Sequence, residues 1–386
     1  MIQSCELGLG QKKRPWLVML CIQVLLGVCC VSVPVAQAQR WETDVSGIVA
    51  ARIEAERAWA AKDASLRWML CKSPITRSQS PSQSQTSSEQ QRANLRWTDP
   101  DPPGRGAFTR DSNQTSEAAC KLLLERLPRP GVLFVGDSLS RLHTNSLAAF
   151  LGAVPARNWK WPRVYGAQAV NIYDACGGRL RIGFVRNDWL DTQLEYDGTQ
   201  SDRGYACAGT DKGSDSHYRN AYCEPWAFEE LLAPFGAVVL NSGAHVQNDQ
   251  NFADRMRAAA KATLSLVPKC TALVYRATVP GHSHCSATSR PFVSLREAEA
   301  SVALQPWHDG DKFQPQNLKA RAIFTTTGFT YLDAYTPTVQ RPDFHVNERD
   351  CLHYCIGGPP DVWVDLLLDI IGSPNPSCPS HSSPTP

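Results

Sequence analysis

The chain has 386 residues and 14 cysteines, and its 39 basic and 37 acidic side chains give a formal net charge of +2. That balance excludes a polybasic nucleic-acid binder, whose affinity depends on many Lys and Arg contacts with phosphate. Apolar residues make up 42% of the chain, which excludes a wholly disordered protein, and no multi-span pattern indicates a polytopic membrane protein. We therefore expect a globular protein, and an α/β fold of this length can form one domain.

Residues 1–38 have the pattern of a secretory leader. Three basic residues at 12–14 precede an apolar run at 16–36, and Ala36-Gln37-Ala38 resembles a small-x-small cleavage site. The run is also about long enough to span a bilayer, so the segment is either a cleaved signal peptide or an uncleaved single-pass anchor. Both alternatives place the bulk of the chain in the secretory lumen or outside the cell.

The cysteines divide between this leader, which holds four, and the remainder, which holds ten. An even count in an oxidising compartment favours disulfides, although their pairing cannot be read from the sequence. The sequon Asn113-Gln114-Thr115 is consistent with lumenal exposure. The ten cysteines beyond the leader are Cys71, Cys120, Cys176, Cys207, Cys223, Cys270, Cys285, Cys351, Cys355 and Cys378.

The chain then divides by composition. Residues 39–94 form a stem, with a helical pattern at 42–70 and a Ser/Gln-rich, flexible stretch at 73–91. Residues 95–372 form the expected catalytic domain, and the Ser/Pro-rich residues 373–386 form a disordered tail.

Short apolar strands alternate with helical segments in the expected domain. The strands are predicted at 132–135, 180–184, 238–240, 273–275 and 331–332, and the clearest helices at 252–267 and from Pro359 to Ile371. This alternation predicts an α/β fold of three layers, in which helices cover both faces of a parallel sheet.

A nucleophile candidate follows the first of these strands, in Gly136-Asp137-Ser138-Leu139-Ser140-Arg141. Ser138 lies at a strand-to-helix turn, at the carboxyl end of a strand, where open α/β sheets bind their ligands. Gly136 would let the backbone approach a ligand closely, and the free N–H groups of the helix can face a developing oxyanion. The alternative is that Asp137 or Ser138 only caps the helix.

A base candidate lies in Asp350-Cys351-Leu352-His353-Tyr354-Cys355, just before the last helix. The Asp350 carboxylate can accept the Nδ1–H of His353, which leaves Nε2 free to take the Ser138 proton. The two flanking cysteines would hold the loop covalently. The alternatives are a Cys-x-His-x-Cys metal site, whose spacing matches no common zinc pattern, and a structural surface histidine.

A third segment, Asn241-Ser242-Gly243-Ala244-His245, directly follows the strand at 238–240. An asparagine at a strand end can point its amide N–H groups at an oxyanion. The alternative is an ordinary turn built from Asn, Ser and Gly.

Together, the GDS segment at 136–138 and the DxxH segment at 350–353 resemble the trichome birefringence-like (PC-esterase) family. Its members are plant-type polysaccharide O-acetyltransferases with an SGNH/GDSL-hydrolase-like α/β fold. The stretches at 241–245, 276–282, 341–345 and 360–363 resemble further family motifs in the same order, so the resemblance spans roughly residues 95–372. The chain departs from the family in lacking the Cys-rich segment before GDS, in Leu142-His143 after Arg141, and in Tyr354 where Trp is common, which suggests a divergent, algal-type member.

The resemblance implies that Ser138 is the nucleophile, His353 the base and Asp350 the residue that orients the base. It also implies an oxyanion hole containing Asn241 and a glycine, which lies either after the second strand or near Gly177-Gly178. The residues expected to form the oxyanion hole or position the substrate are Gly136, Asp137, Asn241, Gly243, Arg141, Arg276 and His282.

The function expected from this resemblance is O-acetyl transfer to a polysaccharide or glycan hydroxyl through an acyl-serine. The donor would be acetyl-CoA or another acyl donor, no metal or organic cofactor is needed, and no nucleic-acid partner is expected. The protein would act in the secretory lumen, as a type II Golgi membrane protein or a secreted one, on cell-wall-type glycans. The alternatives are an esterase with the same triad and a non-catalytic glycan-binding protein that uses exposed tryptophans.

Overall fold

The computed structural model describes residues 115–156, 171–190, 234–245, 251–285, 291–307, 310–347 and 349–373, together with the backbone of residue 170 and of four short strands nearer the N-terminus. It divides the chain into two units, Met1–Ala38 and Gln39–Pro386. In the first unit, β1 (Gln23–Val24) pairs antiparallel with β2 (Gly27–Val28). The rest of the expected leader lies outside the described residues. In the part of the chain that the structure describes, no helix is long and apolar enough to cross a membrane.

In the second unit, β3 (Arg40–Thr43) pairs antiparallel with β4 (Leu95–Thr98). The first two residues of the stretch expected to be helical, Glu42 and Thr43, therefore lie in a strand. The remainder of that stretch, the Ser/Gln-rich segment at 73–91 and the tail from residue 374 lie outside the described residues.

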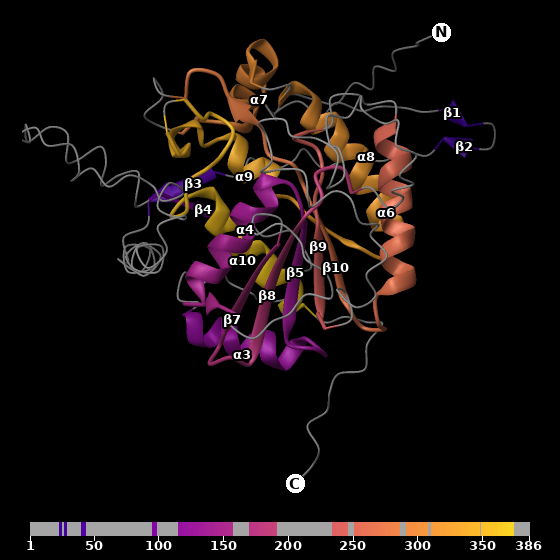
Figure 1. The fold of residues 1–386 in the computed structure, drawn as a ribbon. Helices are drawn as coiled ribbons and strands as arrows, with labels where there is room; N and C mark the ends of the chain where they lie inside the picture. The colour runs from indigo at the N-terminus through magenta and orange to yellow at the C-terminus, as the bar shows by residue number, and fades with distance from the viewer. Residues whose placement is uncertain are drawn as a thin grey trace, which may run out of the picture. The chain divides into compact units, whose positions relative to one another are not determined.

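A seven-stranded sheet forms the centre of this unit, in the order β13-β10-β9-β5-β8-β7-β6 (Figure 1). The five strands from β13 to β8 are parallel, which confirms the predicted parallel sheet, while β7 runs antiparallel to β8 and adds a hairpin that the sequence pattern does not predict. The strands are β5 (Gly131–Gly136), β6 (Val154–Pro155), β7 (Val170–Ala175), β8 (Leu180–Arg186), β9 (Ala237–Leu240), β10 (Ala272–Arg276) and β13 (Thr330–Leu332).

Helices cover the sheet on both sides, as the three-layer prediction requires. On one face lie α3 (Ser116–Arg126), α4 (Ser138–Phe150) and α10 (Pro359–Gly372), and on the other α6 (Phe252–Leu266) and α8 (Phe313–Thr326). Each face of the sheet has a hydrophobic core. Strand β5 contributes side chains to both cores, because its side chains alternate between the two faces. Phe134 packs with Leu142 and Trp363 in one core, while Leu133 and Val135 pack in the other.

Smaller elements follow β10 along the chain. They are β11 (Gly281–His282), α7 (Leu295–Leu304), β12 (Pro306–Trp307), the 3₁₀ turns η6 (Gly310–Lys312) and η7 (Pro342–Phe344), and α9 (Tyr335–Val339). Helices α7 and α9 share a small third core, to which Ala298, Val302 and Val339 contribute.

Disulfides hold the second unit together, as the cysteine count predicts. Cys120 in α3 is bonded to Cys176 in the β7–β8 turn, and Cys285 is bonded to Cys351. Cys270 and Cys355 are also disulfide-bonded. Every described cysteine beyond the leader is therefore part of a disulfide.

Candidate active site

The turn between β5 and α4 presents Ser138 at the carboxyl edge of the sheet. Asp137 is the N-cap of α4, and its Oδ1 accepts hydrogen bonds from the backbone N–H groups of Leu139 (2.9 Å) and Ser140 (3.4 Å). The capping alternative is thus correct for Asp137, which satisfies the free donors of the first turn. Ser138 is the first helical residue, and its hydroxyl is directed to a different partner.

That partner is the imidazole of His353, which lies 215 residues further along the chain. Ser138 Oγ is 2.7 Å from His353 Nε2, and His353 Nδ1 is 2.8 Å from Asp350 Oδ2 and 3.0 Å from Oδ1. A serine hydroxyl, an imidazole and a carboxylate in this order form the arrangement of a Ser-His-Asp triad. The structure therefore brings together the three residues expected to be catalytic.

The Asp350 carboxylate holds both the ring and the backbone of the base. Its Oδ1 accepts the N–H groups of Leu352 (3.2 Å) and His353 (3.0 Å) in addition to the imidazole contact. Burial raises the pKa of Asp350. The hydrogen bonds and charge of His353 together lower it by more than burial raises it, so the pKa falls from 3.8 to about 2. The carboxylate is therefore ionised wherever the imidazole could act as a base.

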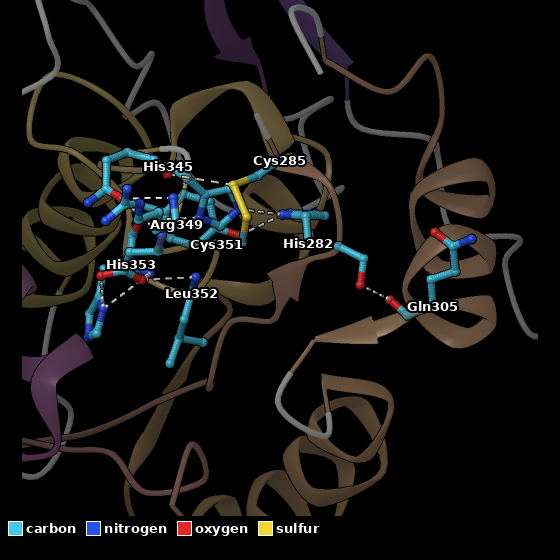
Figure 2. Close-up of a disulfide and its surroundings, with 12 residues drawn as sticks. His282, Cys285, Gln305, His345, Arg349, Cys351, Leu352 and His353 are labelled. Carbon is cyan, nitrogen blue, oxygen red and sulfur yellow. Dashed lines mark hydrogen bonds and ion pairs between the residues drawn. A yellow bond between two sulfur atoms is a disulfide. The ribbon is translucent and has the colours of Figure 1, made fainter. Parts of the chain in front are cut away.

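Asp350 and His353 lie in residues 345–355, here called the base loop. A disulfide and hydrogen bonds join this loop to the segment around β11. The Cys285–Cys351 disulfide ties the loop to the segment after β11, and Figure 2 shows His282, His345 and His353 around this disulfide. The backbone N–H of His282 donates to the Cys351 carbonyl (2.9 Å), and the Tyr354 hydroxyl donates to the Pro280 carbonyl (2.6 Å). Because Cys351 is disulfide-bonded to Cys285, it has no free thiolate to ligate a metal, which argues against the Cys-x-His-x-Cys metal site. Among the described residues, no group of three or more His, Cys, Asp or Glu side chains could hold a metal ion.

Gly136 is required by packing at the end of β5. A Cβ at this position would lie 2.5 Å from Ser140 Oγ and closer still to the Asn241 carbonyl oxygen. The close approach that glycine permits here is to Asn241, just after β9, and to α4, and approach to a ligand stays a prediction. Gly243 is similar, because a Cβ there would overlap the Thr278 side chain.

Arg276 and Asn241 lie behind the nucleophile turn and are fully buried. Arg276 Nη2 donates to Asn241 Oδ1 (2.6 Å), and the Asn241 amide donates to the Arg276 carbonyl and to Thr278 Oγ1 (2.9 Å each). Both amide hydrogens of Asn241 are thus used inside the protein. An oxyanion role for Asn241 stays a prediction, and it requires at least one of these bonds to break.

The buried charge of Arg276 is compensated from the nucleophile turn. Burial lowers the pKa of Arg276 to about 10, while the charge of Asp137 raises it. The Arg276 guanidinium also stacks over the Trp363 ring, 4.9 Å from its centroid. Because no part of Arg276 is exposed, it supports the site from inside the protein and does not line its surface.

Arg141 lies in the first turn of α4, where its N–H donates to the Asp137 carbonyl (3.1 Å) and its side chain is half-buried.

Polar residues also gather at the ends of the strands that flank β5. Asp188 is paired with Arg186 at the end of β8 (2.9 Å) and with His245 beyond β9 (3.4 Å). Ser242 Oγ donates to the Asp188 carbonyl (2.9 Å).

Gly177 and Gly178 lie at the end of β8 that is far from Ser138, because Gly136 is in register with Arg186 at the other end of β8. They are therefore too far from Ser138 to be the glycine of an oxyanion hole.

His282 lies away from Ser138 and contacts the base loop through a second histidine. Its Nδ1 is 2.8 Å from His345 Nε2, and its Nε2 is 2.8 Å from the Val339 carbonyl. His345 Nδ1 is in turn 3.1 Å from the carbonyl oxygen of His353. His345 lies in a stretch that the sequence relates to a family motif, but only the fold shows that it faces His282.

The fold and the site together define a candidate serine enzyme of the α/β type. A sequence model of the PC-Esterase family, described as a GDSL/SGNH-like acyl-esterase family found in Pmr5 and Cas1p, matches residues 119–370. The chain belongs to this family, which confirms the resemblance and supports an acyl-ester hydrolase or transferase activity.

The other two comparisons add little. No curated protein matches the chain. Among solved structures, a mutant of Axe2, an acetyl-xylooligosaccharide esterase from Geobacillus Stearmophilus, is 11% identical, with a TM-score of 0.30 over 62% of this chain and 94% of that one. A similarity of this size supports no functional conclusion.

Proposed function

We propose that the protein is an O-acyltransferase that moves acetyl groups from an acyl donor to hydroxyl groups of a polysaccharide or glycan. The observation that carries the proposal is the unbroken chain from Ser138 Oγ through the His353 imidazole to the Asp350 carboxylate in a member of the PC-Esterase family. Each link is at hydrogen-bond distance, so a proton can move between serine and imidazole without rearrangement.

The first half-reaction loads the serine. His353 Nε2 takes the Ser138 proton as Oγ attacks the acetyl carbonyl, and Asp350 stabilises the imidazolium that forms. The tetrahedral intermediate collapses when His353 returns the proton to the leaving group of the donor, which leaves acetyl-Ser138. The Ser138 backbone N–H, at the start of α4, can donate to the oxyanion at this step.

The second half-reaction reverses these roles. His353 takes the proton of an acceptor hydroxyl as its oxygen attacks the acetyl carbonyl, and then returns a proton to Ser138 Oγ as the acyl–serine bond breaks. A glycan hydroxyl as acceptor gives transfer, while water as acceptor gives acetate. The second candidate, a carbohydrate acetylesterase, differs only in this acceptor, and the acyl-esterase description of the family favours it.

The substrates and the compartment complete the proposal. The donor would be acetyl-CoA or another acyl donor, and the acceptor a neutral glycan, to which the near-neutral chain is suited. The protein would work in the secretory lumen, secreted or held by a single N-terminal anchor. The chemistry itself needs neither a metal nor an organic cofactor. The assembled triad geometry argues for an enzyme over a non-catalytic glycan-binding protein.

The test is an assay of the purified full-length chain with a labelled acetyl donor and glycan oligomers. Label on the glycan in the wild type, and none with Ser138→Ala, would support transfer, whereas label only in acetate would support the esterase. Ser146→Ala is a matched control, because it removes another α4 hydroxyl, which bonds to Asp361 in α10 (2.7 Å). We expect this control to lose about 1 kcal/mol of stability and to keep its activity. Full activity of Ser138→Ala would contradict both enzyme proposals.

A further inference from the structure

Two histidine rings meet where β11 contacts the base loop: His282, which is buried, and His345, which is partly buried. His282 is 3% exposed, and burial lowers the pKa of both His282 and His345. Neither ring contacts Ser138, but His345 bonds to the backbone of the catalytic base itself. A change in this pair is therefore transmitted to His353.

The ring contacts require more hydrogens than two neutral imidazoles possess. There are three contacts: His282 Nε2 with the Val339 carbonyl, His282 Nδ1 with His345 Nε2, and His345 Nδ1 with the His353 carbonyl. A carbonyl oxygen only accepts, so each carbonyl contact uses one ring hydrogen. Two neutral rings carry two hydrogens in total, and none remains for the contact between the rings, where two nitrogen lone pairs would face each other at 2.8 Å.

The neighbouring Tyr354 hydroxyl does not supply the missing hydrogen. It lies 3.2 Å from His282 Nδ1 but only 2.6 Å from the Pro280 carbonyl, to which it donates. Its oxygen is then an acceptor toward His282. If it donated to His282 instead, two oxygen atoms would face each other at 2.6 Å without a hydrogen between them.

We propose that one additional proton is shared between His282 Nδ1 and His345 Nε2, and that the singly charged pair positions the base loop and hence His353. This inference rests on the proposed function, since it assigns positioning residues to the proposed base. With this proton, each of the three contacts has a hydrogen to donate. His345 Nδ1–H then donates to the His353 carbonyl, while the Asp350 carboxylate accepts from the His353 ring.

Burial opposes this charge, and by itself it predicts two neutral rings. The surrounding charges partly offset that cost. Asp343 raises the pKa of His282, and Asp350 raises that of His345, while the charges of His282 and His353 lower the pKa of His345. Asp343 is itself paired with Arg341 at 2.9 Å, whereas Asp350 is paired with His353 at 2.8 Å and is partly exposed. The bond between the rings is charge-assisted, and such bonds are roughly twice as strong as neutral ones.

The shared proton gives the site a defined response to pH. The proton is bound at low pH and lost as the pH rises, and after its loss the lone pairs repel, so one of the two carbonyl contacts must break. Loss of the His345 contact removes one of the bonds that hold the His353 backbone, and the carbonyl then keeps the Val346 N–H (3.0 Å). We therefore expect kcat to fall as the pH rises and the pair loses this proton, and we call this the alkaline fall.

The direct test is NMR of the full-length chain labelled with ¹⁵N at its nine histidines. We expect one strongly downfield ring proton coupled to two nitrogens, and its loss in both His282→Gln and His345→Gln. Two neutral rings, each with one protonated and one bare nitrogen, would overturn the inference. This measurement uses the wild type and does not depend on turnover or on the folding of a variant.

Kinetics then test the positioning role. In His282→Gln the amide N–H can donate to His345 Nε2 without an extra proton, so kcat should fall much less than in His282→Ala and the alkaline fall should disappear. His282→Ala should lower kcat by about tenfold to hundredfold, with KM nearly unchanged, because a misplaced base slows the reaction without touching the substrate. His284→Asn, on the same segment, is the matched control and should behave like the wild type.

An unchanged alkaline fall in His282→Gln would overturn the positioning role. These outcomes are distinguishable from failure of the proposed function. Activity retained in Ser138→Ala would refute the acyl-serine while leaving the shared proton in the NMR spectrum. Absence of the shared proton would leave the triad and its chemistry intact.

Discussion

Adjacent residues at the nucleophile turn have separate tasks. Asp137 caps α4 through Oδ1 and places its charge near the buried Arg276, whereas Ser138 directs its hydroxyl to His353. The GDS segment is therefore both a helix start and a candidate nucleophile. The two readings of the sequence apply to neighbouring side chains and do not exclude each other.

Asp350 connects activity to acid stability. Asp350→Asn should lower kcat by roughly 10⁴-fold, as expected when a triad loses the carboxylate that fixes the imidazole. The folded pKa of about 2 is below the ordinary 3.8, so the carboxylate contributes stability above pH 3.8 that is lost as the pH falls toward 2. The wild type should show this loss in urea unfolding, and Asp350→Asn should lack it.

The control for this prediction is Asp254→Asn, which removes an exposed carboxylate paired with Arg257 on α6. It should leave kcat unchanged and alter the acid stability little. Equal acid dependence in the wild type and Asp350→Asn would show that Asp350 has no special interaction in the folded protein.

A substitution of Arg276 tests whether this residue stabilises the fold or contacts the substrate. Arg276→Met removes a buried cation that faces Asp137, and it should cost about 3–5 kcal/mol of unfolding free energy because a buried carboxylate loses its compensating charge. Arg257→Met, at an exposed position, should cost less than about 1 kcal/mol. Denaturant unfolding of both variants gives the comparison. A stable Arg276→Met with a raised KM would instead place Arg276 at the substrate.

At the scale of elements, the two described disulfides form a matched pair. They close similar lengths of chain, with sequence separations of 56 and 66 residues, so removing either should cost about 4 kcal/mol. Of these two, Cys285–Cys351 is the disulfide that ends in the base loop. The double variant Cys285→Ala/Cys351→Ala should therefore also lose kcat, measured where the protein is still folded, while Cys120→Ala/Cys176→Ala should not. Equal kcat losses in both would contradict a local role for the disulfide.

Four of the five parallel strands could be predicted from the sequence because each is a short apolar run, which is typical of buried parallel strands. Strand β8 could be predicted because Leu180, Ile182 and Phe184 alternate with other residues. The triad could be predicted because its members lie in two short motifs at an element boundary. Strand β7 lacks such a run, since Asn171 and Asp174 interrupt it, and its place was set by pairing with β8. The His282–His345 contact joins residues 63 apart, so only the fold brings these rings together.

For the whole molecule, sheet topology determines where chemistry can occur. Strands β8, β5 and β9 are adjacent and parallel, so their carboxyl ends bring the 186–188, 136–138 and 241–245 segments to one edge. Open α/β sheets bind ligands at this edge. The base loop reaches the same edge from just before α10, and the helical layers on both faces hold the sheet beneath it.

The central claim is that acetyl groups pass through Ser138 to a glycan hydroxyl. The most direct measurement is mass spectrometry of the full-length chain after brief reaction with a labelled acetyl donor, followed by addition of glycan oligomers. The account predicts acetyl label on Ser138 that then appears on the glycan, and no label in Ser138→Ala. Label that reaches the glycan equally well in Ser138→Ala, or never resides on Ser138, would contradict it.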